Sequence, residues 1–206
     1  LLDEPLGALD KKLRQDTQFE LMDIQETTGT TFVIVTHDQE EAMTVASRVA
    51  VMDEGRLMQV ATPDRIYETP NSVYVADFIG DVNIIEGKAA SREGDKLSIV
   101  WAEGEPEISG TSEDVFQTGD TCHFAIRPEK VAISAEKPTD RDNVVRGKVH
   151  DIAYLGNIST YHVELSGGQI LKALATNNRR ISRRSFTWED DVWLSWTSTA
   201  GVVLKN

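Results

Sequence analysis

The chain of 206 residues has room for one large domain or two small ones. Its 40% hydrophobic and 27% charged residues are typical of soluble globular proteins, and no apolar run approaches the ~18 residues of a membrane-spanning helix. The formal net charge of −13 argues against a general affinity for polyanionic nucleic acid, so we expect no nucleic-acid partner. The single cysteine, Cys122, fits a reducing cytoplasm, and the four histidines show no zinc-site spacing.

The first 80 residues alternate helix and strand signals. A helical pattern follows Asp10 and stops at Gly29, with spacings of three and four between its members Leu13, Thr17, Leu21 and Ile24. The β-branched run at residues 31–36 predicts a short strand that is buried on both faces. Asp38 and Glu41 have the spacing of a capping box and predict the start of a second helix.

A strand over residues 48–52, a turn and a return strand over residues 56–60 come next. Two short helices are predicted after Pro63 and after Pro70, ending near Gly80. From about Asp81, short period-two patterns dominate, over residues 96–102, 121–127, 144–152 and 192–196. Such strands predict a small all-β barrel or sandwich. The predicted fold class is therefore α/β followed by all-β, in two domains at residues 1–81 and 82–206.

Two adjacent carboxylates, Asp3 and Glu4, stand in a segment that reads as the end of a buried strand, Leu1-Leu2-Asp3-Glu4-Pro5. The strand after the first helix ends in His37. Strands joined by a helix are parallel in nearly all cases, so we expect the three side chains to converge at one sheet edge. Carboxylates suit Mg²⁺ and the activation of water, and an imidazole can contact a γ-phosphate. The pattern predicts a phosphoryl-transfer site; a surface turn with two acids is the alternative.

The segments "LLDEP", "GALD" and "VTHDQEEA" resemble, in order and spacing, the Walker B segment, D-loop and switch-histidine loop of ATP-binding cassette (ABC) ATPases. The resemblance implies ATP and Mg²⁺ as cofactors, Asp3 as the Mg²⁺ carboxylate, Glu4 as the catalytic base and His37 as the switch residue. It implies further that a second ATPase subunit of a homodimer is contacted by Gly7, Leu9 and Asp10. Many family members have serine where Gly7 stands, which removes a hydroxyl contact there.

The rest of the chain resembles one branch of that family. "SRVAVMDEGRLMQVATPDRIYETPNSVYVADFIGDVN" is similar to importer ATPases that carry a transport-associated OB-type (TOBE) domain. Strands of that domain are resembled by two later segments, "AIRPEKVAIS" and "GKVHDIAYLGNISTYHVEL". "FIGDVNIIEG" most resembles the putrescine/spermidine importers. The resemblance implies a partial P-loop NTPase (RecA-like) sheet in residues 1–81 and an OB-like TOBE domain in residues 82–206. It also implies permease subunits and, indirectly, a periplasmic binding protein as partners, at the cytoplasmic side of the inner membrane, where the protein is peripheral.

A copy of the ABC signature, LSGGQ, stands at residues 165–169, far after Asp3, whereas the family places it shortly before the Walker B segment. Strand-like alternation precedes it, so Ser166, Gly167 and Gly168 are predicted to form a hairpin turn. The 206 residues contain no G-x-x-x-x-G-K-[ST] phosphate cradle and do not start with Met. We therefore expect a fragment of a longer ATPase, inactive by itself.

Two alternatives stay open at this point. The cargo could be a sugar, iron or sulfate, because the ATPase subunit does not touch it. The chain could also be a non-enzymatic regulator with a ligand-sensing β domain. Trp193 and Trp196 should face opposite sides of a strand, with at least one in the core. A basic cluster could contact a phosphate or a lipid headgroup, with a solvated loop as the alternative, and consists of Arg179, Arg180, Arg183 and Arg184.

Overall fold

The computed structural model describes residues 1–178 and 185–205 and consists of two compact units. The first unit comprises residues 1–71 and 78–80, and the second comprises residues 72–77 and 81–206. In the described part of the chain, no helix is both long enough and apolar enough to cross a membrane.

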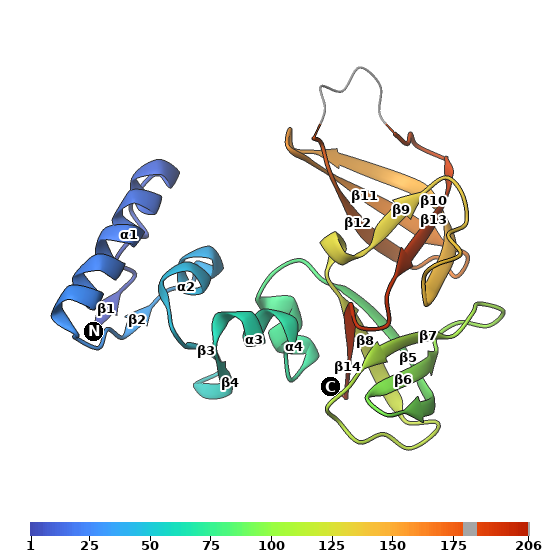
Figure 1. The fold of residues 1–206 in the computed structure, drawn as a ribbon, viewed down its shortest axis with the longest axis horizontal. Helices are drawn as coiled ribbons and strands as arrows, with labels where there is room; N and C mark the ends of the chain where they lie inside the picture. The colour runs from blue at the N-terminus through green and yellow to red at the C-terminus, as the bar shows by residue number, and fades with distance from the viewer. Residues whose placement is uncertain (179–184, 206) are drawn as a thin grey trace. The chain divides into compact units, whose positions relative to one another are not determined.

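The first unit contains a two-stranded parallel sheet, a β-hairpin, one long helix and shorter helices (Figure 1). Its elements are β1 (Leu2–Asp3), α1 (Lys11–Thr28), β2 (Ile34–Val35), α2 (Gln39–Val45), β3 (Val49–Asp53), β4 (Arg56–Ala61) and α3 (Pro63–Glu68), and α4 (Val73–Phe78) follows. The predicted helices, the hairpin of β3 with β4 and the two short helices near Pro63 and Pro70 are confirmed.

Side-chain caps explain where the first two helices begin and end. Asp10 Oδ1 accepts hydrogen bonds from two backbone N–H groups of the first turn of α1, both at 3.0 Å, and Gly29 ends this helix with φ 62°. Asp38 Oδ1 accepts from Glu41 N at 3.1 Å at the start of α2. The Glu41 carboxylate does not return to Asp38, because its Oε2 accepts from Thr36 Oγ1 at 2.8 Å. Only half of the predicted capping box therefore forms.

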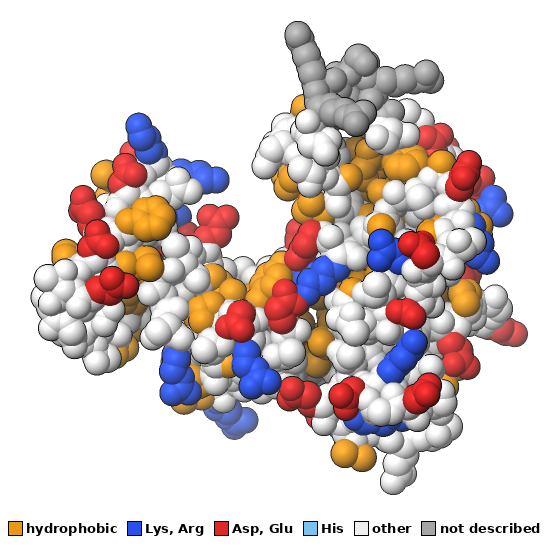
Figure 2. Space-filling view, in the orientation of Figure 1, with side chains coloured by type: hydrophobic (Ala, Val, Ile, Leu, Met, Phe, Trp, Pro, Cys, Tyr) orange, Lys and Arg blue, Asp and Glu red, His pale blue; other side chains and the backbone are white. Residues whose placement is uncertain are grey.

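The expectation that the first strands are buried is wrong in this structure. The side chains of Val33 and Val35 are 56% and 52% exposed, and Leu1 is 90% exposed. The alternating neighbours Phe32 and Ile34 are half-buried. Since successive strand residues point to opposite faces, the described residues cover only one face of this two-stranded sheet. Figure 2 likewise shows hydrophobic side chains among acidic ones on the surface of α1.

The second unit is built from two β-sheets (Figure 1). Strands β14-β7-β6-β5-β8 close a barrel, and β12-β11-β10-β13-β9 form a five-stranded sheet. The bounds are β5 (Asn83–Glu93), β6 (Lys96–Val100), β7 (Ile108–Thr111), β8 (Thr121–Ile126), β9 (Ala132–Ser134), β10 (Asn143–Tyr154), β11 (Ile158–Leu165), β12 (Ile170–Thr176), β13 (Asp191–Trp196) and β14 (Gly201–Leu204), with a 3₁₀ turn at Pro128–Lys130. The predicted β-barrel character is confirmed.

The two sheets of this unit repeat one strand order and exchange their last strands. Strands β5–β8 form a first set and strands β10–β13 a second. In each set, the first strand lies between the second and the fourth: β5 between β6 and β8, and β10 between β11 and β13. β9 follows the first set but pairs with β13, whereas β14 follows the second set but pairs with β8. Both sets open with Asn-[Ile/Val]-[Ile/Val]-x-Gly-Lys, at residues 83–88 and 143–148. This repeat was not predicted.

The asparagine that opens each set joins it to the other sheet. Asn83 Oδ1 accepts from Lys172 N at 2.7 Å, and its Nδ2 donates to Lys172 O at 2.9 Å. Asn143 makes the same two bonds to Ser109, at 2.7 and 2.9 Å. Both side chains are buried and both satisfy a strand residue of the opposite sheet, so matched polar contacts join the two sheets.

One hydrophobic core spans both sheets. It includes Phe124 from β8 and Trp196 from β13, whose rings stack with centroids 5.9 Å apart. Cys122 is fully buried in the same core, and burial, followed by the charge of Asp120, raises the pKa of its thiol to about 11. The thiol is therefore neutral at physiological pH and does not act as a thiolate nucleophile.

At Gly147 the strands approach too closely for a side chain. A Cβ there would lie 2.5 Å from Val163 Cγ1 and 2.8 Å from the backbone oxygen of Glu164. Gly147→Ala should lower the free energy of unfolding by ~1–3 kcal/mol through overpacking. The matched control is Gly167→Ala, where a Cβ meets nothing within 4 Å, and this change should shift stability by less than ~1 kcal/mol. Urea unfolding of both variants measures the difference, and equal midpoints would contradict the prediction.

Candidate functional site

The candidate site lies where β1 and β2 end. The two strands pair in parallel, with Asp3 opposite Val35, and Glu4 N donates to Val35 O at 2.8 Å. Their carboxyl ends therefore lie at one edge of the sheet, as the connecting helix predicts. Glu4 leaves the strand with φ 46°, in the left-handed region that non-glycine residues rarely adopt. Backbone strain of this kind clusters at functional sites.

The structure brings Glu4 and His37 into direct contact. Glu4 Oε1 and His37 Nδ1 are 2.8 Å apart, and the two side chains are 53% and 76% exposed. The hydrogen bond from Glu4, followed by its negative charge, raises the pKa of His37 above its ordinary value, with smaller contributions from Asp38 and Glu41. The pair is accessible and shares one proton position, which suits a group that meets a ligand from solvent.

The raised pKa of His37 gives a pH-dependent prediction. The Glu4 contact favours the imidazolium, so its stabilising contribution is present below the unfolded pKa of ~6.5 and is lost as the pH rises through the higher folded pKa. Glu4→Gln should lower the pKa of His37 toward the ordinary value. An NMR pH titration of the His37 imidazole signals measures this pKa. The control is Glu20→Gln, which changes an exposed residue of α1. Identical His37 titrations in the parent and Glu4→Gln would refute the contact.

Asp3 lies beside Glu4 at the end of β1 and is exposed. Its side chain makes no hydrogen bond or ion pair with the residues that the structure describes. An exposed carboxylate fits Mg²⁺, because this ion keeps several waters and takes few protein ligands. Among the described residues, no group of three or more His, Cys, Asp and Glu side chains is placed to hold a metal ion.

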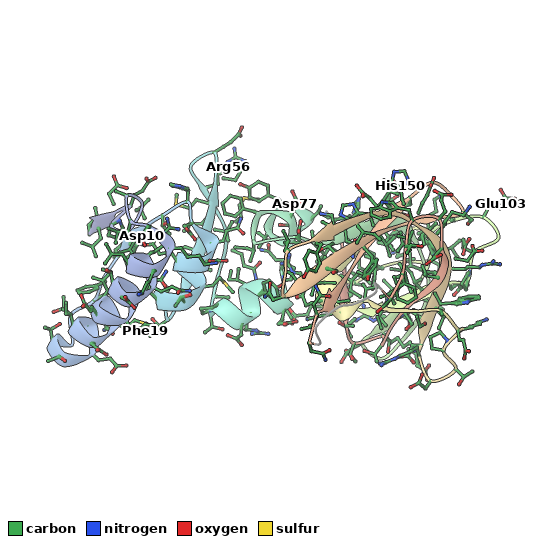
Figure 3. The ribbon with its side chains drawn as sticks, turned by 90° about the horizontal axis from the view of Figure 1, so that it is seen from above. Asp10, Phe19, Arg56, Asp77, Glu103 and His150 are labelled. Atoms are coloured by element: carbon green, nitrogen blue, oxygen red, sulfur yellow. The ribbon has the colours of Figure 1, made fainter. Side chains whose placement is uncertain are left out.

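The Gly7–Asp10 loop follows Glu4 as two consecutive turns. Gly7 N donates to Glu4 O at 3.2 Å, and Leu9 N donates to the carbonyl of Leu6 at 3.1 Å. The carboxylate of Asp10 is engaged as the cap of α1, at the helix start labelled in Figure 3. A Cβ at Gly7 would lie 3.6 Å from Glu4 Oε2, an ordinary contact, so a serine would fit at this position. The glycine is thus not required by the backbone.

Sequence reasoning missed Arg14 and the partners that it joins. Arg14 Nη1 lies 2.5 Å from Asp38 Oδ2, and its Nη2 donates to Leu9 O at 3.2 Å. Asp38 was predicted only as a helix cap, although it follows His37 directly. The available signal was an arginine one turn into a capped helix, which by itself does not identify a distant partner.

The LSGGQ segment is a turn, as predicted. β11 ends at Leu165 and pairs with β12 in antiparallel fashion, with Glu164 opposite Ile170. Gly168 closes the hairpin with φ 77°, and Leu165 N donates to Gln169 O at 2.8 Å. No helix begins here, so these residues cannot present a helix N-terminus to a phosphate.

The tryptophan prediction is confirmed, because Trp196 is 1% exposed in the core and Trp193 lies outside it with Lys137 Nζ 5.2 Å from its ring centroid. The basic cluster Arg179, Arg180, Arg183 and Arg184 lies outside the described residues.

Comparison with known proteins shows that the chain is similar to transport and import ATP-binding proteins. Residues 124–204 match the TOBE domain family. The chain is 44% identical over 99% of its length to the putrescine transport ATP-binding protein PotG of Escherichia coli, and covers 54% of that protein. It is 40% identical over its whole length to the spermidine/putrescine import ATP-binding protein PotA of Nitrosospira multiformis, and covers 57% of it. The chain thus spans about half the length of the curated relatives it matches.

A solved structure supports the fold of the β region. The cytoplasmic molybdate-binding protein ModG superposes with a TM-score of 0.52 at 12% sequence identity, covering 59% of this chain and 94% of that protein. At this identity the likeness concerns the fold alone, and it places the β unit among OB-like barrels.

Proposed function

Because the chain is a relative of the ATP-binding proteins of polyamine importers, we propose that it is the C-terminal part of the ATP-hydrolysing subunit of such an importer. The observation that carries the proposal is the contact of Glu4 with His37 at the shared end of two parallel strands. A whole-chain likeness without an intact acid–imidazole pair would support only a structural relationship.

Each residue of the site has a chemical task in this proposal. Glu4 is the general base that accepts a proton from the water attacking the γ-phosphate of ATP. His37 holds the Glu4 carboxylate through Nδ1 and leaves its other ring nitrogen for the phosphate. Asp3 would hold Mg²⁺, which supplies charge neutralisation at the phosphates. The phosphate cradle must come from outside these 206 residues, which contain none.

The proposed architecture assigns residues 1–81 to the C-terminal part of a P-loop nucleotide-binding domain and residues 82–206 to the TOBE domain. The parallel pairing of β1 with β2 and the family match at residues 124–204 support this assignment. Gly7, Leu9 and Asp10 would face a second ATPase subunit of a homodimer. Permease subunits would bind the assembled protein at the cytoplasmic side of the membrane, with a periplasmic binding protein acting indirectly.

An uptake assay in a strain that lacks the gene tests the proposed cargo. Radiolabelled putrescine or spermidine uptake should be lost in the deletion strain and restored by the parent protein, whereas a Glu4→Gln gene should not restore it. Uptake of labelled sugar, sulfate and iron in the same strains is the control. If the deletion leaves polyamine uptake unchanged but reduces the uptake of a control compound, the polyamine assignment is wrong and that compound is the cargo. The assignment as an importer ATPase would then stand.

A further inference from the structure

One guanidinium links the loop that follows Glu4 to the residue that follows His37. Arg14 lies on α1, and its Nη1 is 2.5 Å from Oδ2 of Asp38, the residue that follows His37. Its Nη2 donates to Leu9 O, in the loop that follows Glu4. The Arg14 and Asp38 side chains are 30% and 26% exposed, so water screens this charge-assisted contact less than it screens a pair on the open surface.

Asp38 is held from both sides and in turn holds the backbone next to His37. Its Oδ1 caps α2 through Glu41 N, and its Oδ2 meets Arg14. Its backbone N donates to Thr36 Oγ1 at 3.0 Å, and that hydroxyl donates to the buried Glu41 at 2.8 Å. The residues before and after His37 are therefore both fixed, while the imidazole itself remains exposed.

This cluster has features that stability alone does not explain. Arg14 Nε and Glu41 Oε1 are buried, and neither atom has a hydrogen-bond partner among the described residues. Unpartnered buried polar atoms cost stability, and an apolar contact between α1 and α2 would avoid that cost. The arrangement is instead suited to setting the distance between two loops with directional bonds.

From these contacts we infer that Arg14 is a positioning residue, which fixes the His37 loop against the Gly7–Asp10 loop and so keeps His37 on Glu4. Arg14 touches neither the reacting phosphate nor the water in this scheme; it acts through Asp38 and Leu9. The inference rests on the proposed function, since the geometry it protects is that of the ATPase site.

The test uses the full-length protein assembled with its permease subunits and compares kcat and KM for ATP. Arg14→Met should lower kcat by ~10- to 100-fold through misplacement of the pair, with KM for ATP unchanged. Asp38→Asn should have a similar effect, because asparagine still caps α2 but cannot form the ion pair. The double variant should be no worse than either single one, and Arg14→Lys should recover part of the loss. Lys12→Met, which removes an exposed charge from the same helix, is the control.

The outcomes separate this inference from the proposed function. If Glu4→Gln abolishes turnover while Arg14→Met and Asp38→Asn keep the parental kcat, the positioning role is wrong and the ATPase assignment stands. If Glu4→Gln itself leaves turnover intact, the assignment of the ATPase site is wrong. Equal losses of ATP affinity and kcat in both Arg14→Met and Asp38→Asn, with no recovery in Arg14→Lys, would show a merely structural role and overturn the inference.

Discussion

Glu4→Gln in the full-length protein should reduce the steady-state rate of ATP hydrolysis by ~10²-fold or more, as expected when a positioned general base is removed. Glutamine keeps the shape of the side chain and can still hydrogen-bond to His37, but it cannot accept the proton of the attacking water. ATP binding should be retained, because the proposed base does not hold the phosphates. The change therefore affects kcat and leaves the affinity for ATP.

The measurement is phosphate release at saturating ATP, paired with a direct binding titration of the nucleotide. Glu93→Gln, which removes an exposed carboxylate from β5, is the matched control and should hydrolyse ATP at the parental rate. A Glu4→Gln protein that turns over at the parental rate would refute the role of Glu4, and one that fails to bind ATP would show that the change disrupts the fold of the site.

Phe124→Ala should have the largest effect on stability, lowering the free energy of unfolding by ~3–5 kcal/mol. The ring is fully buried, stacks on Trp196 of the other sheet and occupies the space beside Gly110 and Gly201. A Cβ at Gly201 would lie 2.3 Å from Phe124 Cζ, so the surrounding backbone is fitted to this ring. Because its contacts belong to both sheets, the loss should destabilise them together.

Urea unfolding followed by tryptophan fluorescence and by circular dichroism measures this effect in the same experiment. Val115→Ala is the control, since Val115 is 78% exposed and its truncation should change stability by less than ~0.5 kcal/mol. All four tryptophans lie in the second unit, so their fluorescence reports on that unit alone. Two separate fluorescence transitions in the parent protein, or a Phe124→Ala midpoint equal to that of Val115→Ala, would contradict a single core that spans both sheets.

Local chemistry in the sequence determined most of the elements. Asp10 and Gly29 mark the ends of α1 because a carboxylate cap and a left-handed glycine act within one turn of the helix. The LSGGQ turn was predictable for the same reason, since the glycines and the flanking alternation are neighbours in the chain. The meeting of Glu4 with His37 was also predictable, because a strand–helix–strand connection places both strand ends on one edge.

The sequence by itself therefore determined the order and type of the elements, the residues of the candidate site and the edge at which they meet. Only the tertiary structure decided the burial of β1 and β2, the exchange of β9 and β14, the matched contacts of Asn83 and Asn143, and the link from Arg14 to Asp38. Capping and turn preferences act over a few neighbouring residues, whereas exchange and cross-loop contacts depend on which distant segments the packed chain brings within hydrogen-bond distance.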